Sequence, residues 1–178
     1  MNDPILETER LRLRPFRDSD APMVLELLND PGWLRFIGDR KVRSLDDARG
    51  YVRKLHETYE RHDFGLYMVE RKDDHEPLGM CGLVKRDTLR DPDLGFAFLA
   101  RHRGAGYAEE AARATLRHAA NDLGLPRLAA VVTPGNERSA SLLEKLGFAR
   151  ESTTPWNGDD KDVVEIWGKP LEAPTARP

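Results

Sequence analysis

Two glycines among arginines mark the segment whose chemistry best suits an anion. Gly104 and Gly106 follow an apolar run and precede an alanine-rich segment with helical spacing. Glycine allows the backbone to turn its N–H groups toward a ligand, and a helix start adds amide donors and partial positive charge. This combination binds phosphate. A plain strand-to-helix turn beside solvated arginines explains the same residues, so the glycines alone leave both interpretations open.

Two common phosphate-binding motifs do not fit this segment. A dinucleotide fingerprint requires a third glycine where the chain has Glu109, and a P-loop requires a Gly-Lys-Ser/Thr run that the sequence does not contain. The spacing that remains is Arg103-x-x-Gly106-x-Ala108. We therefore expect an anion site of another kind.

The elements that position this segment follow from hydrophobic periodicity. Short polar connectors between the middle strands favour antiparallel pairing. Residues 30–42 are predicted to form a loop, and we expect one α+β domain over 1–171 with a flexible tail over 172–178. The predicted strands are 10–16, 65–71, 77–86, 94–100, 127–132 and 162–171, and the predicted helices are 18–30, 44–63, the segment ending near Leu123 and the segment ending at Gly147.

Composition narrows the classes of function. The chain has 178 residues and a net charge of −3, so its overall charge does not favour nucleic acid as a partner. It has one cysteine, Cys81, which fits a reducing compartment. No apolar run approaches the roughly 18 residues of a membrane span, and the five histidines lack metal-site spacing. The sequence predicts a cytoplasmic protein without a metal, a membrane or a nucleic-acid partner.

Three segments in order resemble the GNAT superfamily of acetyl-CoA-dependent N-acetyltransferases. They are "ETERLRLRPFRDSDA", "PDLGFAFLARHRGAGYAEEA" and "TPGNERSASLLEKLGF", and the resemblance spans roughly 8–170. The first is similar to the opening of the ribosomal-protein N-terminal acetyltransferase subgroup. The resemblance implies a mixed, mostly antiparallel sheet flanked by helices. It also implies that the fourth and fifth strands, 94–100 and 127–132, splay apart to admit acetyl-CoA.

The same resemblance implies a set of acetyl-CoA contacts. Backbone groups of Phe98 and Leu99 would pair with the pantetheine arm, as an added strand would. Asn136 would contact the pantetheine or phosphate region, although it is equally suited to cap its own helix. The pyrophosphate would bind the loop and helix start, namely Arg101, Arg103, Gly104, Ala105, Gly106, Tyr107 and Ala108.

The reaction implied is transfer of acetyl from a thioester to a neutral amine. Asp93 stands where many members of the subgroup carry a glutamate, and its shorter side chain favours action through a bridging water. Closing the "RDPD" turn is the alternative role. Many members place a tyrosine acid where this chain has Leu143, which cannot donate a proton. Ser139 is the candidate to hydrogen-bond the leaving sulfur, unless it only caps its helix.

The acceptor is the least determined part of the prediction. Trp33, Phe36 and Trp156 are candidates for its apolar walls, and the acids Asp39, Asp159 and Asp160 for attracting a cationic amine. Ordinary loop aromatics and turn acids explain them equally well. We expect a protein N-terminus or a small amine as acceptor, and a monomer or homodimer. A non-catalytic acyl-CoA-binding module and a plain protein-interaction domain remain as alternatives.

Overall fold

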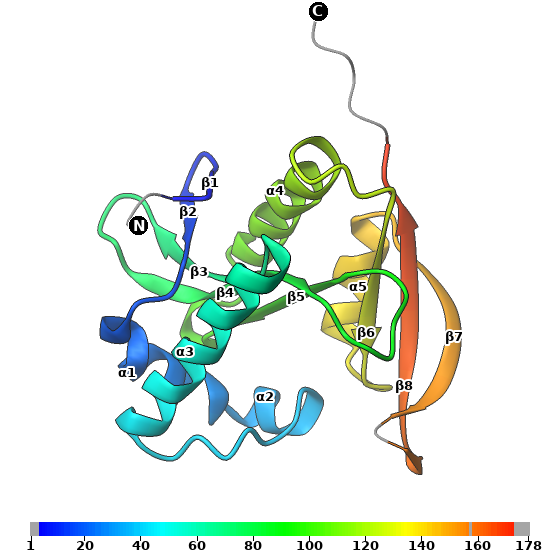
Figure 1. Cartoon of the computed structure of the whole chain (residues 1–178), viewed down its shortest axis with the longest axis horizontal. Coiled ribbons are helices and arrows are strands. Elements are labelled where there is room, and N and C mark those ends of the chain that lie inside the picture. The colour runs from blue at the N-terminus through cyan, green and yellow to red at the C-terminus, as the bar shows by residue number, and fades with distance from the viewer. Residues whose placement is uncertain (1–3, 157, 173–178) are drawn as a thin grey trace, which may run out of the picture.

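The fold is one mixed sheet with helices on both faces (Figure 1). The computed structural model describes residues 4–156 and 158–172. The strands lie in the order β1-β2-β3-β4-β5-β6-β8-β7, and only the β5–β6 pair is parallel. Their bounds are β1 Leu6–Glu7, β2 Leu11–Arg14, β3 Leu66–Arg71, β4 Pro77–Val84, β5 Asp93–Phe98, β6 Arg127–Val132, β7 Ala149–Trp156 and β8 Asp159–Pro170.

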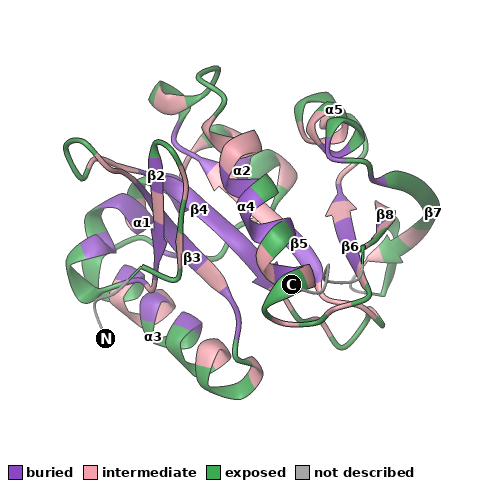
Figure 2. Ribbon diagram, turned by 90° about the horizontal axis from the view of Figure 1, so that it is seen from above, coloured by how far each residue is buried: buried purple, intermediate pink, exposed green. Residues whose placement is uncertain are grey.

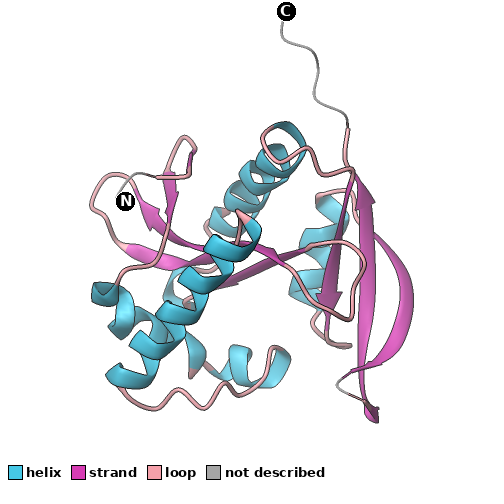
Figure 3. Cartoon of the chain, viewed as in Figure 1, coloured by secondary structure: helices cyan, strands magenta, loops and turns pink. Residues whose placement is uncertain are grey.

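In the described residues, five α-helices cover the two faces of the sheet (Figure 3). They are α1 Ala21–Leu28, α2 Pro31–Phe36, α3 Leu45–His62, α4 Tyr107–Asn121 and α5 Glu137–Lys145, with short 3₁₀ turns η1 Asp18–Asp20 and η2 Ala100–His102. Two apolar cores result: one holds residues of α4 and α5, and the other holds residues of α1, α2 and α3. Neighbouring strand residues point to opposite faces, so Phe98 enters the first core and Leu99 the second.

The centre of the sheet is its most buried part (Figure 2). Along β4, every residue from Leu78 to Leu83 is buried. Two of these are glycines whose backbone lies against neighbouring strands: a Cβ on Gly79 would stand 2.2 Å from the Ala97 carbonyl oxygen. The central strands are therefore a rigid support for the loops at their ends.

The sheet opens between β5 and β6. These strands share one paired position, Asp93 with Ala129, and the Ala129 N–H donates to the Pro92 carbonyl at 2.9 Å. In the described part of the chain no further pair joins them, and Figure 1 shows the two strands diverging from that end. The predicted α+β fold with a splayed fourth and fifth strand is confirmed, since those segments are β5 and β6 here.

Three segments differ from the sequence expectation. Residues 6–7 form the short strand β1, which was not predicted. Residues 31–36 form α2 instead of a loop, because the Asp30 carboxylate accepts the Gly32 N–H at 2.9 Å and Pro31 occupies the first turn. Residues 149–156 form β7, which the sequence analysis missed. β7 is an edge strand that pairs only with β8, and most of its side chains are exposed, so it lacks the alternation that predicts a strand.

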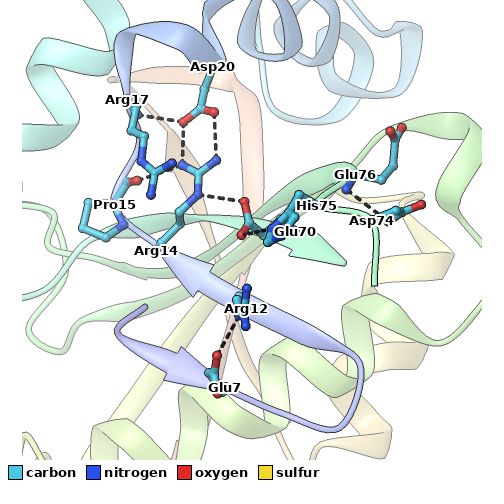
Figure 4. A network of polar contacts seen from close by, with 10 residues as sticks. All are labelled: Glu7, Arg12, Arg14, Pro15, Arg17, Asp20, Glu70, Asp74, His75 and Glu76. Carbon is cyan, nitrogen blue, oxygen red and sulfur yellow. Dashed lines mark hydrogen bonds and ion pairs between the residues drawn. The ribbon is translucent and has the colours of Figure 1, made fainter. Parts of the chain in front are cut away.

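A buried ion network fastens β2 to the rest of the fold (Figure 4). The Arg14 guanidinium on β2 bonds both carboxylate oxygens of Asp20 at 2.8 and 3.0 Å. Its Nε donates to Glu70 Oε2 on β3 at 2.8 Å. All three side chains are less than a tenth exposed. The Arg14 side chain thus joins β2, the turn before α1, and β3.

Two further expectations concern the chain's end and membranes. The predicted tail lies outside the described residues, apart from Glu172. In residues 4–156 and 158–172, no helix has the length and apolar character that crossing a bilayer requires.

Candidate active site

The glycine loop ends in the start of α4 at the open side of the splayed strands. Gly104 and Gly106 have φ values of +85° and +81°, a region that glycine enters without strain. Gly106 is the N-cap of α4 and accepts the Glu110 N–H at 3.1 Å. The amides of Tyr107, Ala108 and Glu109 precede that first helical bond and therefore have no partner within the helix. Three backbone donors are therefore available where the sequence analysis placed an anion site, and that site stays a prediction.

Arg10 holds this loop from the side of β2. Its Nη1 donates to the Ala105 carbonyl at 2.9 Å, and its guanidinium lies 4.6 Å from the centroid of the Tyr107 ring. Its Nε bonds Glu110 Oε2 at 2.6 Å, and Thr8 Oγ1 donates to the same carboxylate at 2.6 Å. Burial raises the pKa of Glu110, but the hydrogen bonds from Thr8 and Arg10 together bring it below its usual value. The carboxylate therefore stays ionised at neutral pH and keeps Arg10 in place.

The two loop arginines are directed at acids of the opposite layer. Arg103 donates to the Phe98 carbonyl at 3.0 Å and to Asp30 Oδ1 at 2.7 Å, so it ties the end of β5 to the cap of α2. Arg101 pairs with Glu26 of α1. Backbone amides, rather than these two side chains, are the donors that the loop leaves available.

One edge of β5 faces the opening. The Leu99 N–H donates to the Leu78 carbonyl at 3.0 Å, and the Leu99 carbonyl accepts the His102 N–H. Since backbone groups alternate in direction along a strand, those of Phe96 and Phe98 point toward β6. The Phe98 carbonyl already accepts Arg103, which leaves the N–H groups of Phe96 and Phe98 for a ligand. The sequence analysis assigned Leu99 a contact with the pantetheine arm, but both of its backbone groups already form hydrogen bonds within the protein.

Asp93 lies where β5 and β6 meet. It is 2% exposed, and Arg86 Nε donates to its Oδ1 at 2.9 Å. Burial raises the pKa of Asp93, and the positive charge of Arg86 acts against that rise. The Arg86 guanidinium also lies 5.5 Å from the centroid of a Trp156 ring, at the end of β7. Asp93, Arg86 and Trp156 are thus brought together from β5, the β4–β5 connection and β7.

The predicted acceptor residues come from α2, the segment after it, and strands β7 and β8. Trp33 is 4% exposed and donates to the Gly38 carbonyl, so it is a core residue with little surface for a ligand. Phe36 is half-buried, and its carbonyl accepts Thr133 Oγ1 at 2.7 Å, which joins the end of α2 to the end of β6. Asp39 pairs with Arg43 at 2.6 Å, and Asp159, at the start of β8, accepts the Lys161 N–H. The exposed Asp160 follows it in β8.

The start of α5 lies at the end of β6. Asn136 caps α5 by accepting the Ser139 N–H at 3.3 Å, which leaves its NH₂ group for other contacts. Among the residues that the structure describes, none bonds the Ser139 hydroxyl. Leu143 is 1% exposed in the first core, so neither its type nor its position offers a proton to a ligand.

A cavity of about 670 Å³ lies between α5 and strands β6–β8. Thr133 and Asn136 are on its wall, so it adjoins the open end of the splay. Three glutamates also line it, Glu137, Glu144 and Glu165. Among the described residues, only Glu165 of these three forms an ion pair, with Arg150 at 3.0 Å. An acidic wall does not suit phosphate, which supports the α4 start as the anion site.

Comparison with known proteins decides the family. The model of the acetyltransferase (GNAT) domain matches residues 10–149. The chain belongs to the GNAT acetyltransferase family. It is 30% identical over 149 residues to the N-acetyltransferase YoaA of Bacillus subtilis, which covers 83% of this chain and 84% of YoaA. It is 29% identical over 122 residues to the ribosomal protein uS5-alanine N-acetyltransferase of Escherichia coli, covering 67% and 58%.

Solved GNAT structures share the fold. RimL, the ribosomal L7/L12 α-N-protein acetyltransferase, in complex with coenzyme A, superposes with a TM-score of 0.79 and covers 96% of this chain and 99% of RimL. Because the sequence identity to RimL is only 16%, this similarity shows a shared fold alone. The resemblance to the ribosomal-protein acetyltransferases that the sequence indicated is confirmed, and the chain is an acetyltransferase.

The sequence analysis missed three residues of this site. Arg10 directly precedes β2, Asp30 caps α2, and Arg86 lies in the β4–β5 connection. Asp30 had a usable signal, since "DPGW" places a capping acid before a proline at a helix start. Arg10 and Arg86 had none, because their partners lie at least seven residues away along the chain.

Proposed function

We propose that the protein is an acetyl-CoA-dependent N-acetyltransferase that transfers acetyl to a primary amine by direct attack in a ternary complex. One observation carries the proposal. β5 and β6 separate after a single paired position, and the glycine loop and the start of α4 lie at the open end. A slot with an unpaired strand edge and the backbone amides of a helix start fits an extended ligand that has amide groups and a diphosphate.

The residues fit acetyl-CoA in a definite order. The N–H groups of Phe96 and Phe98 would pair with the pantetheine arm, because they face the opening. The amides from Gly104 to Ala108 would hold the diphosphate, and Asn136 would reach the ligand from the other side through its NH₂ group. Arg101 and Arg103 would act indirectly, by fixing the loop against α1 and α2.

Chemistry at the closed end requires a neutral amine. At pH 7 roughly one α-amine in ten, and one lysine side chain in a few thousand, is unprotonated. We propose that Asp93 accepts the proton, through a water because its side chain is short and bonded to Arg86. The coenzyme A thiolate leaves without a strong acid, since a thiol pKa near 8.5 makes it a tolerable leaving group. The Ser139 hydroxyl is proposed to hydrogen-bond it.

Direct attack is favoured over a covalent acetyl-enzyme because of the state of the cysteine. Cys81 is fully buried on β4, 3.5 Å from Thr115 Oγ1, and burial raises the pKa of its thiol to about 12. A protonated, enclosed thiol is a poor nucleophile. The acetyl group would therefore pass to the amine in one transfer.

Calorimetry with acetyl-CoA and thiol release on an amine panel test the proposal together. We expect binding of acetyl-CoA, and release of free thiol that depends on an added amine. The panel should include peptides with free N-termini, N-terminally blocked copies of the same peptides, and small amines. Absence of binding at millimolar acetyl-CoA would refute the proposal. Binding without amine-dependent thiol release would instead support a non-catalytic acyl-CoA-binding module.

A further inference from the structure

A basic groove lies beside α3, apart from the acetyl-CoA slot. It has a volume of about 370 Å³ and lies between the first turns of α3 and the segment that joins α2 to α3. Four cations line it, Arg40, Lys41, Arg53 and Lys54, and all four are exposed. The chain as a whole carries a net charge of −3, so this concentration of positive charge is local.

The cations of the groove are not neutralised by the fold. In the described ranges, 4–156 and 158–172, none of the four forms an ion pair. Two acids also lie on the wall, and neither forms an ion pair with these four cations. Asp46 Oδ1 accepts Arg49 Nη1 at 2.7 Å, and Asp47 Oδ2 accepts the Arg43 N–H at 2.9 Å. Unpaired cations around a hollow favour an anionic ligand.

The segment that forms one wall of the groove follows α2, and the last residue of α2, Phe36, accepts Thr133 Oγ1 at the end of β6. The groove is therefore continuous with an element that reaches the end of β6. Tyr51 stands on the groove's wall, half-buried. Burial raises the pKa of its hydroxyl, while nearby cations, Arg86 among them, act against that rise. Arg86 is in turn the partner of Asp93.

We propose that this groove binds acidic side chains of the acceptor, so that the enzyme acetylates the N-terminus of acidic peptide segments. The inference rests on the proposed function. The groove and Asp93 belong to different elements, α3 and β5, so one ligand must be long enough to reach both. An extended peptide advances about 3.3–3.6 Å per residue. A peptide with its amine at Asp93 would thus bring carboxylates a few residues later to Arg53 and Lys54.

The test uses three peptides with the same N-terminal alanine, followed by glutamates, glutamines or lysines. We expect kcat/KM for the glutamate peptide to exceed that for the glutamine peptide by about tenfold, as a lower KM, and the lysine peptide to be poorest. Raising the salt concentration should reduce the difference. Arg53→Glu and Lys54→Glu should each remove most of it while acetyl-CoA affinity stays unchanged.

Arg117→Glu is the matched control, because it reverses an exposed charge on α4, on the other face of the sheet. It should leave the preference intact. Equal kcat/KM across the three peptides, or the same loss in Arg117→Glu as in Arg53→Glu, would overturn the inference. Small aminodicarboxylates that outperform every peptide would also overturn it, since they cannot span the distance.

A second measurement keeps the inference separate from the proposed function. A glutamate peptide with a blocked N-terminus cannot react, but it should still bind the wild-type protein, and more weakly the Arg53→Glu variant, in calorimetry. Failure of acetyl-CoA binding alongside normal peptide binding would count against the acetyltransferase mechanism alone. Normal acetyl-CoA binding without charge-dependent peptide binding would count against the groove alone.

Discussion

Asp93 is subject to two opposing influences at the residue scale. Burial at the junction of β5 and β6 raises its pKa, which makes the carboxylate a stronger base. The guanidinium of Arg86, 2.9 Å away, favours the ionised form. A carboxylate whose pKa is raised by burial, with a neighbouring cation acting against the rise, is suited to accept a proton near neutral pH. The Arg86 guanidinium also lies 5.5 Å from the centroid of a Trp156 ring, so one cation contacts both the carboxylate and an aromatic that the sequence analysis proposed for the acceptor site.

Asp93→Asn should lower kcat by about a hundredfold, because asparagine cannot accept a proton. The residual rate should keep rising with pH up to the pKa of the acceptor amine, since only the amine already unprotonated would react. Thiol-release rates measured across pH 5–9 check this. An unchanged rate across that range would exclude the role of Asp93 as base.

Arg86→Gln is the matched variant, since it removes the partner and keeps the carboxylate. Arg86 lowers the pKa of Asp93, so its loss should raise that pKa and move the acidic limb of the pH profile to higher pH. Activity above the shifted limb should be retained. If Arg86→Gln behaved like Asp93→Asn at all pH values, the pair would have a structural role only.

At the scale of the element, the start of α4 depends on backbone geometry that side chains alone do not supply. Gly106 caps the helix in the left-handed region, and Arg10 and Glu110 hold the adjoining loop against β2. The amides can face a diphosphate only while this geometry lasts. The affinity for acetyl-CoA should therefore respond to strain at Gly106 more than to the loss of any single loop side chain.

Gly106→Ala should weaken acetyl-CoA binding by about tenfold, because an L-residue in the left-handed region costs about 1–2 kcal/mol and the loop would relax away from it. Gly124→Ala is the control at the other end of α4. Gly124 has φ +62° and, like Gly104, has no atom within 4 Å of its added Cβ, so the substitution imposes backbone strain alone. It should lower the thermal midpoint and leave the acetyl-CoA dissociation constant unchanged. Equal loss of affinity in both variants would contradict the local role.

On the scale of the whole molecule, the buried Arg14 network joins β2 to the layer that holds α1 and α3. Arg14 makes two hydrogen bonds to Asp20, one to Glu70 and one to the Pro15 carbonyl, and His75 lies 3.3 Å from Glu70 (Figure 4). Removing one member of a buried ionic cluster leaves uncompensated charge in the interior. Arg10 directly precedes β2 and bonds the glycine loop, so the attachment of β2 affects the candidate site as well.

Arg14→Met should lower the free energy of unfolding by about 3–5 kcal/mol, because Asp20 and Glu70 would remain buried without a cation. Urea unfolding monitored by tryptophan fluorescence measures the change. Arg113→Met on α4 is the control, since it breaks an exposed pair with Glu109 that should contribute at most about 1 kcal/mol. A loss below about 1 kcal/mol in Arg14→Met would show that the network has no such stabilising role.

The glycine loop and the helix after it could be predicted from the sequence because their signals are local. Gly104, Gly106 and the helix after them are contiguous, so turn chemistry and periodicity are enough to place them. The acceptor side could not, because its residues come together only in three dimensions. Trp33 illustrates this: as a loop aromatic it was a candidate wall, but the unpredicted helix α2 turns it into the second core. The single domain, its oligomeric state and its cytoplasmic location stay predictions.

By itself, the sequence determined the class of fold, the glycine-rich start of the helix over 107–121 and the family resemblance, because each depends on spacing within segments of the chain. The anion site at that helix start stays a prediction. Only the tertiary structure decided how the charges are shared. It directs Arg101 and Arg103 to acids of α1 and to the cap of α2, and it pairs Arg86 with Asp93. Among the described residues, it leaves the four cations beside α3 without an ion pair. The physical reason is that an ion pair depends on distance in space. Arg103 and Asp30 are 73 residues apart in the chain, and the fold brings Arg103 Nη2 to 2.7 Å from Asp30 Oδ1.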